Sequence, residues 1–220
     1  MTATRRPSRR LERSLQRQGL ARIAGVDEVG VACLAGPVVA AAVIMPAGAS
    51  FIAGVRDSKQ VPTREERERL AREIRAVALA VGVGRASVLE IDRLNILHAT
   101  HLAMRRALAL VLPYDHALVD GNPIRDVEMG SHTEIVRGDA RVYSIACASI
   151  VAKVARDRLM VRLAASHPGY GWARNVGYPT PEHRAALRRL GVTRHHRRDF
   201  GTVRLLRLGE QLGLPGLSPD

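Results

Sequence analysis

The chain of 220 residues has few cysteines and no long apolar run, and each shortage argues against a class of protein. Cys33 and Cys147 lie far apart and provide neither a disulfide framework nor a zinc site, so both are predicted to be small buried side chains. No stretch of about 18 uninterrupted apolar residues predicts a membrane-spanning helix. The basic N-terminal segment is not followed by the apolar core of a signal sequence. The expected location is therefore the cytoplasm.

Lysine is also scarce, although the chain is strongly basic. It has 34 basic and 21 acidic residues, a formal charge of +13 and a sequence pI near 11.2. This charge favours a polyanionic partner, with nucleic acid first and an anionic membrane second. Only Lys59 and Lys153 are lysines, however, and genome base composition can produce such a preference for arginine. Charge alone therefore does not establish nucleic-acid binding.

The length suits one compact domain with at most a small appendage. Residues 1–20 are rich in arginine and are expected to be a flexible arm, either simply solvated or in contact with a phosphate backbone. Residues 21–207 form the expected single domain, and residues 208–220 form a tail.

Apolar periodicity predicts strands and helices that alternate along the chain. Two apolar runs between residues 23 and 45 flank a turn with glycine and proline, and they predict a hairpin-like strand pair. Thr63 and Glu66 form a capping box that opens a helix to about residue 79, and residues 80–88 return as a strand.

The second half of the chain continues this alternation. A helix is expected over residues 90–112, and the strand-like runs at 116–122 and 133–140 each carry an acid near their ends. Ser144 is predicted to be the N-cap of an amphipathic helix, and residues 181–190 form a further helix. The order of elements predicts a layered α/β domain with a mixed sheet.

Three aspartates, Asp27, Asp120 and Asp139, lie at or near the ends of apolar strand-like runs with a glycine close by. Functional groups of α/β sheets gather where strands end, so these acids are expected to converge at one edge of the sheet. Glu28 would face the opposite side of an ideal strand and joins the cluster only if the strand ends or bends there, which Gly30 permits. A single aspartate beside a glycine is more often a turn residue, so only the joint placement of the three aspartates predicts a site.

A cluster of four carboxylates without histidine or cysteine predicts a site for Mg²⁺ or Mn²⁺ rather than zinc. Two such ions about 4 Å apart activate a water and stabilise the leaving oxygen of a phosphodiester. The basic charge would then hold the polyanion while the acids hold the metal ions.

Eight segments of the sequence resemble those of one family, bacterial ribonuclease HII, also called type 2 ribonuclease H. The similarity begins with the Asp-Glu pair and "LAGPVV" that follows it. It covers nearly all of residues 22–207. The further segments, in order, are "DSK" at 57–59, "EIDRLNILHATHLAM" at 90–104, "LVDGN" at 118–122, "VRGDARV" at 136–142, "ASIVAKVARDRLM" at 148–160, "YGWARNVGYPT" at 170–180 and "HHRRDFG" at 195–201.

The resemblance implies a ribonuclease H-like fold, with a mixed five-stranded sheet flanked by helices and a C-terminal helical part. It implies an endonuclease that uses Mg²⁺ or Mn²⁺ to cut RNA–DNA hybrids, or 5′ of a ribonucleotide embedded in duplex DNA, leaving 3′-hydroxyl and 5′-phosphate ends. Such an enzyme acts in ribonucleotide excision during replication and repair, and here is expected to be a monomer without a membrane partner. The catalytic, metal-binding acids would be Asp27, Glu28, Asp120 and Asp139.

The resemblance also implies substrate contacts outside the acids. Tyr178 aligns with a family tyrosine that packs against the sugar at the RNA–DNA junction, and the alternative is a buried core tyrosine. Lys153 and Arg156 are candidates to approach phosphates, although Lys153 and Asp157 could equally form an ion pair on a helix. Ser144 is a further expected substrate contact. The three histidines of the C-terminal part are expected to be solvated or near phosphate: His183, His195 and His196.

The chain departs from the family in its substrate turn. The family's Gly-Arg-Gly-Pro is here Gly30, Val31, Ala32 and Cys33, and this turn grips the ribonucleotide largely through backbone groups that recognise the 2′-hydroxyl. Val31 stands where the family has arginine, so a positive charge that could contact a phosphate is lost. Ala32 stands where the family has glycine and adopts a positive φ less easily.

A second departure places Asn175 and Val176 where the family usually has His-Lys. The sequence therefore predicts retained cleavage with altered or weakened recognition of the junction. Two alternatives stay open: a non-catalytic protein that binds RNA–DNA hybrids, and a nuclease of the same fold that acts on DNA alone.

Overall fold

The computed structural model describes residues 6–122 and 127–211, which fall into two compact units that interleave along the chain. The first unit comprises the residues up to 29 together with 39–85 and 100–155. The second comprises 30–38, 86–99 and the residues from 156 onward. The sheet belongs to the first unit, and most of the C-terminal helical part belongs to the second.

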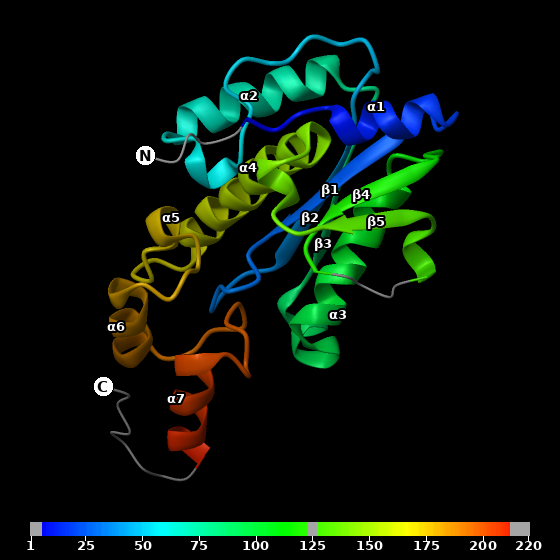
Figure 1. The fold of residues 1–220 in the computed structure, drawn as a ribbon. Coiled ribbons are helices and arrows are strands. Elements are labelled where there is room, and N and C mark those ends of the chain that lie inside the picture. The colour runs from blue at the N-terminus through cyan, green and yellow to red at the C-terminus, as the bar shows by residue number, and fades with distance from the viewer. Residues whose placement is uncertain (1–5, 123–126, 212–220) are drawn as a thin grey trace. The chain divides into compact units, whose positions relative to one another are not determined.

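The sheet has five strands in the order β3-β2-β1-β4-β5 (Figure 1). β1 is antiparallel to β2 and parallel to β4, and β4 is parallel to β5, which confirms the predicted mixed sheet. Because Val26 is paired with Val119, the next residues Asp27 and Asp120 reach the same edge on neighbouring strands. The strand bounds are Ile23–Val29 (β1), Val38–Ile44 (β2), Ala80–Ala86 (β3), His116–Asp120 (β4) and His132–Ile135 (β5).

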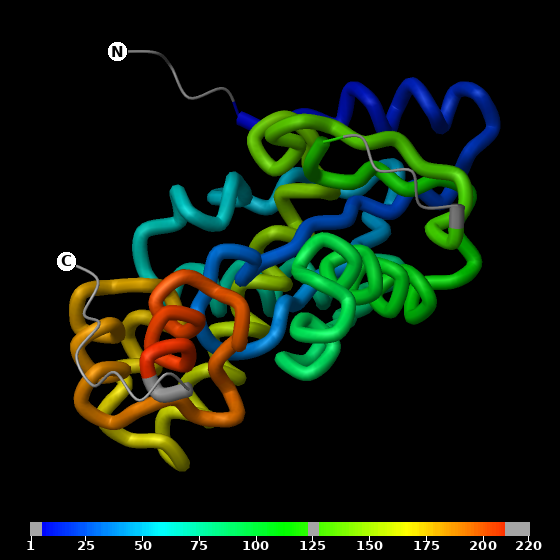
Figure 2. Tube along the Cα trace, turned by 90° about the horizontal axis from the view of Figure 1, so that it is seen from below, coloured from blue at the N-terminus to red at the C-terminus, as the bar shows by residue number. Residues whose placement is uncertain are grey.

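Helices α2 (Arg64–Val77) and α4 (Tyr143–Ser166) pack on the same apolar cluster as β2. All seven residues of β2 are buried, so the strand reads as a continuous apolar run. Thr63 accepts a hydrogen bond from the Glu66 N–H at 3.1 Å, as the capping box predicts. The other face is covered by residues 100–109 of α3 (Val88–Ala109) (Figure 2). A Cβ atom at Gly82 or Gly84 of β3 would overlap the backbone of Ala107 or Ala103 in this part of the helix.

Helix α4 approaches β1 most closely at Gly25. A Cβ atom at this position would overlap the backbone of Ser144 and Ile145. Only glycine therefore allows the N-terminal part of α4 to lie directly on the strand that carries Asp27.

Helix α3 is not the continuous helix that the periodicity predicts. Asn95 has φ 65° and interrupts it, and its side-chain oxygen accepts hydrogen bonds from the N–H groups of Leu97 (2.9 Å) and His98 (3.2 Å). Asparagine tolerates positive φ better than other non-glycine residues, and here it caps the second segment.

The N-terminal segment differs from the predicted flexible arm. It forms helix α1 (Arg10–Arg17), in which Glu12 is buried and accepts hydrogen bonds from both the N–H and the hydroxyl of Ser144 at 3.0 Å. Arg9 is buried too, donates to the carbonyl of Ala49 at 2.6 Å and lies 4.5 Å from the ring centre of Tyr143. Long-range contacts of this kind leave no periodic signal in the segment itself.

Ser144 is not the predicted N-cap. It lies one residue inside α4, and Glu12 rather than the helix end takes its hydroxyl hydrogen.

We expect Glu12→Ala to lower the free energy of unfolding by about 1–3 kcal/mol, because it leaves two buried donors of Ser144 without an acceptor. Urea denaturation followed by circular dichroism measures the change. Arg13→Ala, at an exposed position of the same helix, is the control and should alter the value by less than about 0.5 kcal/mol. Equal effects of the two substitutions would contradict the assignment.

The second unit is built around Leu34, Met160, Trp172 and Val203. Its short helices are α5 (Trp172–Asn175), α6 (Pro181–Leu190, as predicted) and α7 (Gly201–Gln211). The described part of the first unit also contains the 3-10 helices η1 (Ser58–Gln60), η2 (Val127–Met129) and η3 (Gly138–Ala140).

Two of the three C-terminal histidines are buried, which contradicts their predicted solvation. His183 accepts a hydrogen bond from the indole N–H of Trp172 at 3.0 Å, and His183 Nε2 lies 3.1 Å from His196 Nε2. Burial lowers the pKa of His196 to about 3, so its ring is neutral and structural. Cys33 and Cys147 are buried free thiols, as predicted.

Candidate active site

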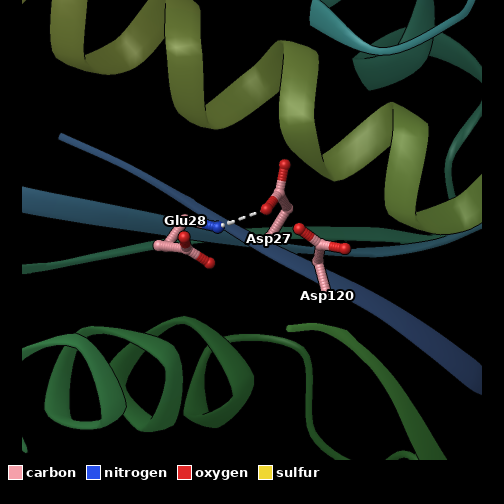
Figure 3. A group of neighbouring side chains, drawn as sticks. All are labelled: Asp27, Glu28 and Asp120. Carbon is pink, nitrogen blue, oxygen red and sulfur yellow. Dashed lines mark hydrogen bonds between the residues drawn. The ribbon is translucent and has the colours of Figure 1, made fainter. Parts of the chain in front are cut away.

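Three of the four predicted acids come together at the edge of the sheet. One carboxylate oxygen from each of Asp27, Glu28 and Asp120 lies within 4.8 Å of the other two (Figure 3). Asp27 and Asp120 meet because they occupy neighbouring positions on the parallel strands β1 and β4. Their convergence follows from strand register alone.

Glu28 joins the cluster although β1 does not end at this residue, one of the two conditions (an end or a bend) under which it was expected to do so. It is still paired with Ala40 within β1, and the strand continues to Val29. In Figure 3 Asp27 points toward the overlying helix, while Glu28 leaves β1 on another side. The Glu28 N–H donates to Asp27 Oδ1 at 2.8 Å, which fixes the Asp27 carboxylate.

Asp139 lies on η3, close to the other three acids but outside the 4.8 Å group that the described residues form. Burial, together with the charges of Asp57 and Asp120, raises the pKa of Asp139 to about 6. The N–H of Gly138 donates to Asp120 Oδ1 at 2.5 Å. This hydrogen bond ties η3 to the end of β4 and holds the third and fourth acids near each other.

The site brings several carboxylates close together in a largely buried position. Burial and the charges of Glu28 and Asp120 raise the pKa of Asp27 well above its ordinary value. Burial and Asp120 raise the pKa of Glu28 to about 7. Buried carboxylates at such short separations cannot all ionise unless cations neutralise them.

Three residues that the sequence argument did not assign to the site also contribute to it. Asp57 acts on the pKa of Asp139, and Lys59 lowers the pKa of both Glu28 and Asp139. Ser149 of α4 hydrogen-bonds to Asp27, and its hydroxyl also lies 2.9 Å from the hydroxyl of Ser58, to which it donates. Asp57 and Lys59 lie in the segment 57–59, and Ser149 lies in the segment 148–160. Both segments resemble the ribonuclease HII family, and this resemblance was the only feature of the sequence that could have identified the three residues.

The donor set fits a hard divalent cation. It consists of carboxylate oxygens, which Mg²⁺ and Mn²⁺ prefer, and it contains no thiolate or imidazole that would favour zinc. The raised pKa values of Asp27, Glu28 and Asp139 likewise show that the site favours a bound positive charge.

The predicted substrate turn belongs to the second unit, and two of its four residues are exposed. Gly30 is buried with φ +97°, whereas Val31 is 37% exposed and Ala32 is also exposed. Ala32 is not among the described non-glycine residues with positive φ, so the strain expected from the loss of glycine is absent. Val176 does adopt a positive φ, of 42°. Tyr178 is half-buried and packs against the apolar cluster of this unit.

Two other predicted substrate contacts are contradicted. Ser144 is 1% exposed and is already bonded to Glu12. Arg156 is 0% exposed and donates its hydrogen bonds to backbone carbonyls, so it cannot reach a phosphate. Lys153 is half-buried on α4. Within residues 6–122 and 127–211, no helix has the length and apolar composition needed to cross a membrane.

Comparisons with known proteins find similarity to one family over most of the chain. The family model described as ribonuclease HII matches residues 24–203. A ribonuclease HII of Moorella thermoacetica is 59% identical over 190 residues, covering 86% of this chain and 91% of that protein. A ribonuclease HII of Thermosynechococcus vestitus is 56% identical over 189 residues, covering 86% and 88%. The crystal structure of the ribonuclease H2 of Pyrococcus horikoshii matches with a TM-score of 0.70 and 25% identity, covering 87% of this chain and 99% of that one.

Proposed function

Because the chain belongs to the ribonuclease HII family, we propose that its clustered acids hold divalent cations and cut a phosphodiester bond. The chain is an endonuclease of the type 2 ribonuclease H class. The proposed catalytic, metal-binding acids are Asp27, Glu28, Asp120 and Asp139.

Two cations, Mg²⁺ or Mn²⁺, would supply activation of the attacking water and neutralisation of the charge that develops on the phosphodiester. The chain's own part is to hold the carboxylate oxygens in fixed positions. Ser149 and the Glu28 N–H orient Asp27, and the Gly138 N–H orients Asp120. Lys59 offsets part of the negative charge at Glu28 and Asp139. In-line displacement would leave 3′-hydroxyl and 5′-phosphate ends.

The proposed substrate is the RNA strand of an RNA–DNA hybrid, or a ribonucleotide embedded in duplex DNA. The formal charge of +13 favours such a polyanion. We assign the junction contacts to Gly30, Val31, Ala32 and Tyr178, and a phosphate contact to Lys153. Residues 21–207 would act as one catalytic domain in a monomer, and the turn would hold the junction less tightly than a turn with arginine.

The convergence of the acids at the sheet edge carries this proposal, and a comparison of three substrates tests it. These are a duplex with one ribonucleotide, an RNA–DNA hybrid and an all-DNA duplex, each with Mg²⁺, Mn²⁺ or EDTA. Metal-dependent cleavage of the first two supports the proposal. Binding of the hybrid without cleavage would favour a non-catalytic binding protein, and cleavage of the all-DNA duplex would favour a DNA nuclease.

We expect Val31→Arg to lower the KM for the single-ribonucleotide duplex several-fold, because it returns a cation to an exposed position of the turn. A single added phosphate contact should also steepen the dependence of log KM on log salt by about 1. Steady-state kinetics at several salt concentrations measures both values. Val31→Gln is the uncharged control, and an unchanged salt dependence in Val31→Arg would contradict the proposed contact.

A further inference from the structure

Two fully buried arginines of the second unit donate hydrogen bonds from all three nitrogens of their guanidinium groups. Arg156 and Arg197 are each 0% exposed. All six acceptors are backbone carbonyls. Arg156 donates to Pro37 (3.0 Å), Val176 (2.8 Å) and Ala35 (3.0 Å), and Arg197 donates to Gly36 (3.0 Å), Val31 (2.7 Å) and Gly30 (2.6 Å).

Five of these six carbonyls belong to residues 30–37, which include the substrate turn. Arg197 holds the start of the turn through the carbonyls of Gly30 and Val31, and it holds the segment that follows the turn through the carbonyl of Gly36. The N–H groups of Val31 and Ala32, by contrast, have no hydrogen-bond partner in the described part of the chain, and both residues are exposed. Arg197 therefore occupies the carbonyls of Gly30 and Val31, while the N–H groups of Val31 and Ala32 stay available.

Arg156 also connects the turn to the loop that carries Tyr178. Its Nη1 donates to the carbonyl of Val176, and the Leu34 N–H donates to the carbonyl of Gly177 at 2.8 Å. The side chain of Arg156 packs so closely on Gly30 that a Cβ there would overlap the guanidinium. This packing is a reason, besides its φ of +97°, for glycine at the one turn position that keeps the family residue.

Each guanidinium group is planar and rigid, so it can bind several backbone carbonyls in fixed directions. A guanidinium presents five donors in a fixed fork, whereas a lysine ammonium is a single flexible donor group. Burial, and secondarily the nearby charge of Arg156, lowers the pKa of Arg197 to about 10, so the group stays charged at neutral pH. A merely apolar core could fill this space but could not fix the direction of six carbonyl groups.

We propose that Arg156 and Arg197 are positioning residues for ribonucleotide recognition. They hold the backbone of the turn and of the Tyr178 loop in the shape that reads the ribonucleotide, so that the side chains of residues 31–33 can differ from the family without loss of that shape. The proposal rests on the proposed function of the chain. It assigns selectivity for ribonucleotides to the two arginines and leaves phosphate affinity to the surface of the turn.

Binding rather than cleavage gives the decisive measurement. All variants are made in the Asp120→Asn protein. Fluorescence anisotropy measures their affinity for a short duplex with one ribonucleotide and for the same duplex made entirely of DNA. Adding Arg197→Lys or Arg156→Lys should reduce the ratio of the two affinities at least fivefold and change binding of the all-DNA duplex less than twofold. With Arg197→Ala, guanidinium at millimolar concentration should restore part of the ratio relative to sodium at equal ionic strength.

Arg198→Lys is the matched control, because Arg198 follows Arg197 directly and its side chain is 61% exposed. An unchanged ratio in folded Arg156 and Arg197 variants, or an equal fall in Arg198→Lys, overturns the proposal. Thermal unfolding identifies variants that do not fold. If none of the three folds, even with guanidinium, the arginines only maintain the fold and the proposal fails. Cleavage by the wild type, measured separately, decides the proposed function: a cleaving enzyme without ribonucleotide preference overturns only the arginine assignment.

Discussion

Asp120→Asn is expected to lower the rate of RNA-strand cleavage by roughly three orders of magnitude and to leave hybrid binding within about twofold. Asparagine keeps the size of the side chain and an oxygen that can accept from the Gly138 N–H, so the end of β4 should stay in place. What it removes is one negative charge from the three acids that lie within 4.8 Å of one another. Single-turnover cleavage and hybrid binding by anisotropy measure the two quantities.

Asp115→Asn is the control for this experiment, because Asp115 is an exposed acid just before the same strand. It should cleave within about twofold of the wild type. Cleavage by Asp120→Asn at a tenth of the wild-type rate or more would contradict the catalytic assignment. Absence of cleavage in the wild type, with Mn²⁺ present and hybrid bound, would instead favour the non-catalytic alternative.

Glu28→Gln is expected to stabilise the metal-free protein by about 3 kcal/mol above pH 7 and by almost nothing below pH 4.5. Burial and Asp120 raise the pKa of Glu28 from 4.5 to about 7, so the native state binds this proton more tightly than the unfolded state does. The wild type therefore loses stability as the pH rises from about 4.5 to 7, whereas glutamine cannot ionise and does not. Urea denaturation of both proteins across this pH range gives the difference between their free energies of unfolding. The contributions of the histidines cancel in this difference because both proteins contain them.

The same experiment with Mn²⁺ links stability to metal binding. Millimolar Mn²⁺ should raise the melting temperature of the wild type at pH 8 and have little effect at pH 5, where protons compete more strongly with the metal for the carboxylates. Glu28→Gln should reduce this gain, and Glu65→Gln, at an exposed position of α2, should not. A gain of equal size at both pH values would show that Mn²⁺ binds elsewhere.

Local patterns in the sequence were sufficient to predict the sheet and the central acids. Strand-like runs that end in Asp27 and Asp120 predict that both residues lie at the same edge, and the parallel pairing of β1 with β4 places them there. The capping residue Thr63 marked the start of α2 within one residue. Glu28 joins the cluster although β1 does not end at that position, because its pairing with β2 continues to Val29.

Contacts between distant parts of the chain could not be predicted in this way. Ser144 has the residue type of an N-cap, but its partner Glu12 lies 132 positions away and converts it into a buried support for α1. Arg156 and His183 have the residue types of phosphate contacts, and both are buried. A charged residue in a basic sequence carries no local sign of whether its partner is a phosphate or a backbone carbonyl.

The close packing of α4 on Gly25 limits which substitutions this enzyme can accept. Any side chain at Gly25 would displace the helix that carries Ser149, and with it the hydroxyl that orients Asp27. A position with no reactive group is thus as closed to substitution as the acids themselves. Protein engineers who wish to alter the substrate range of this fold are left with the exposed turn, where the side chains of Val31 and Ala32 face solvent.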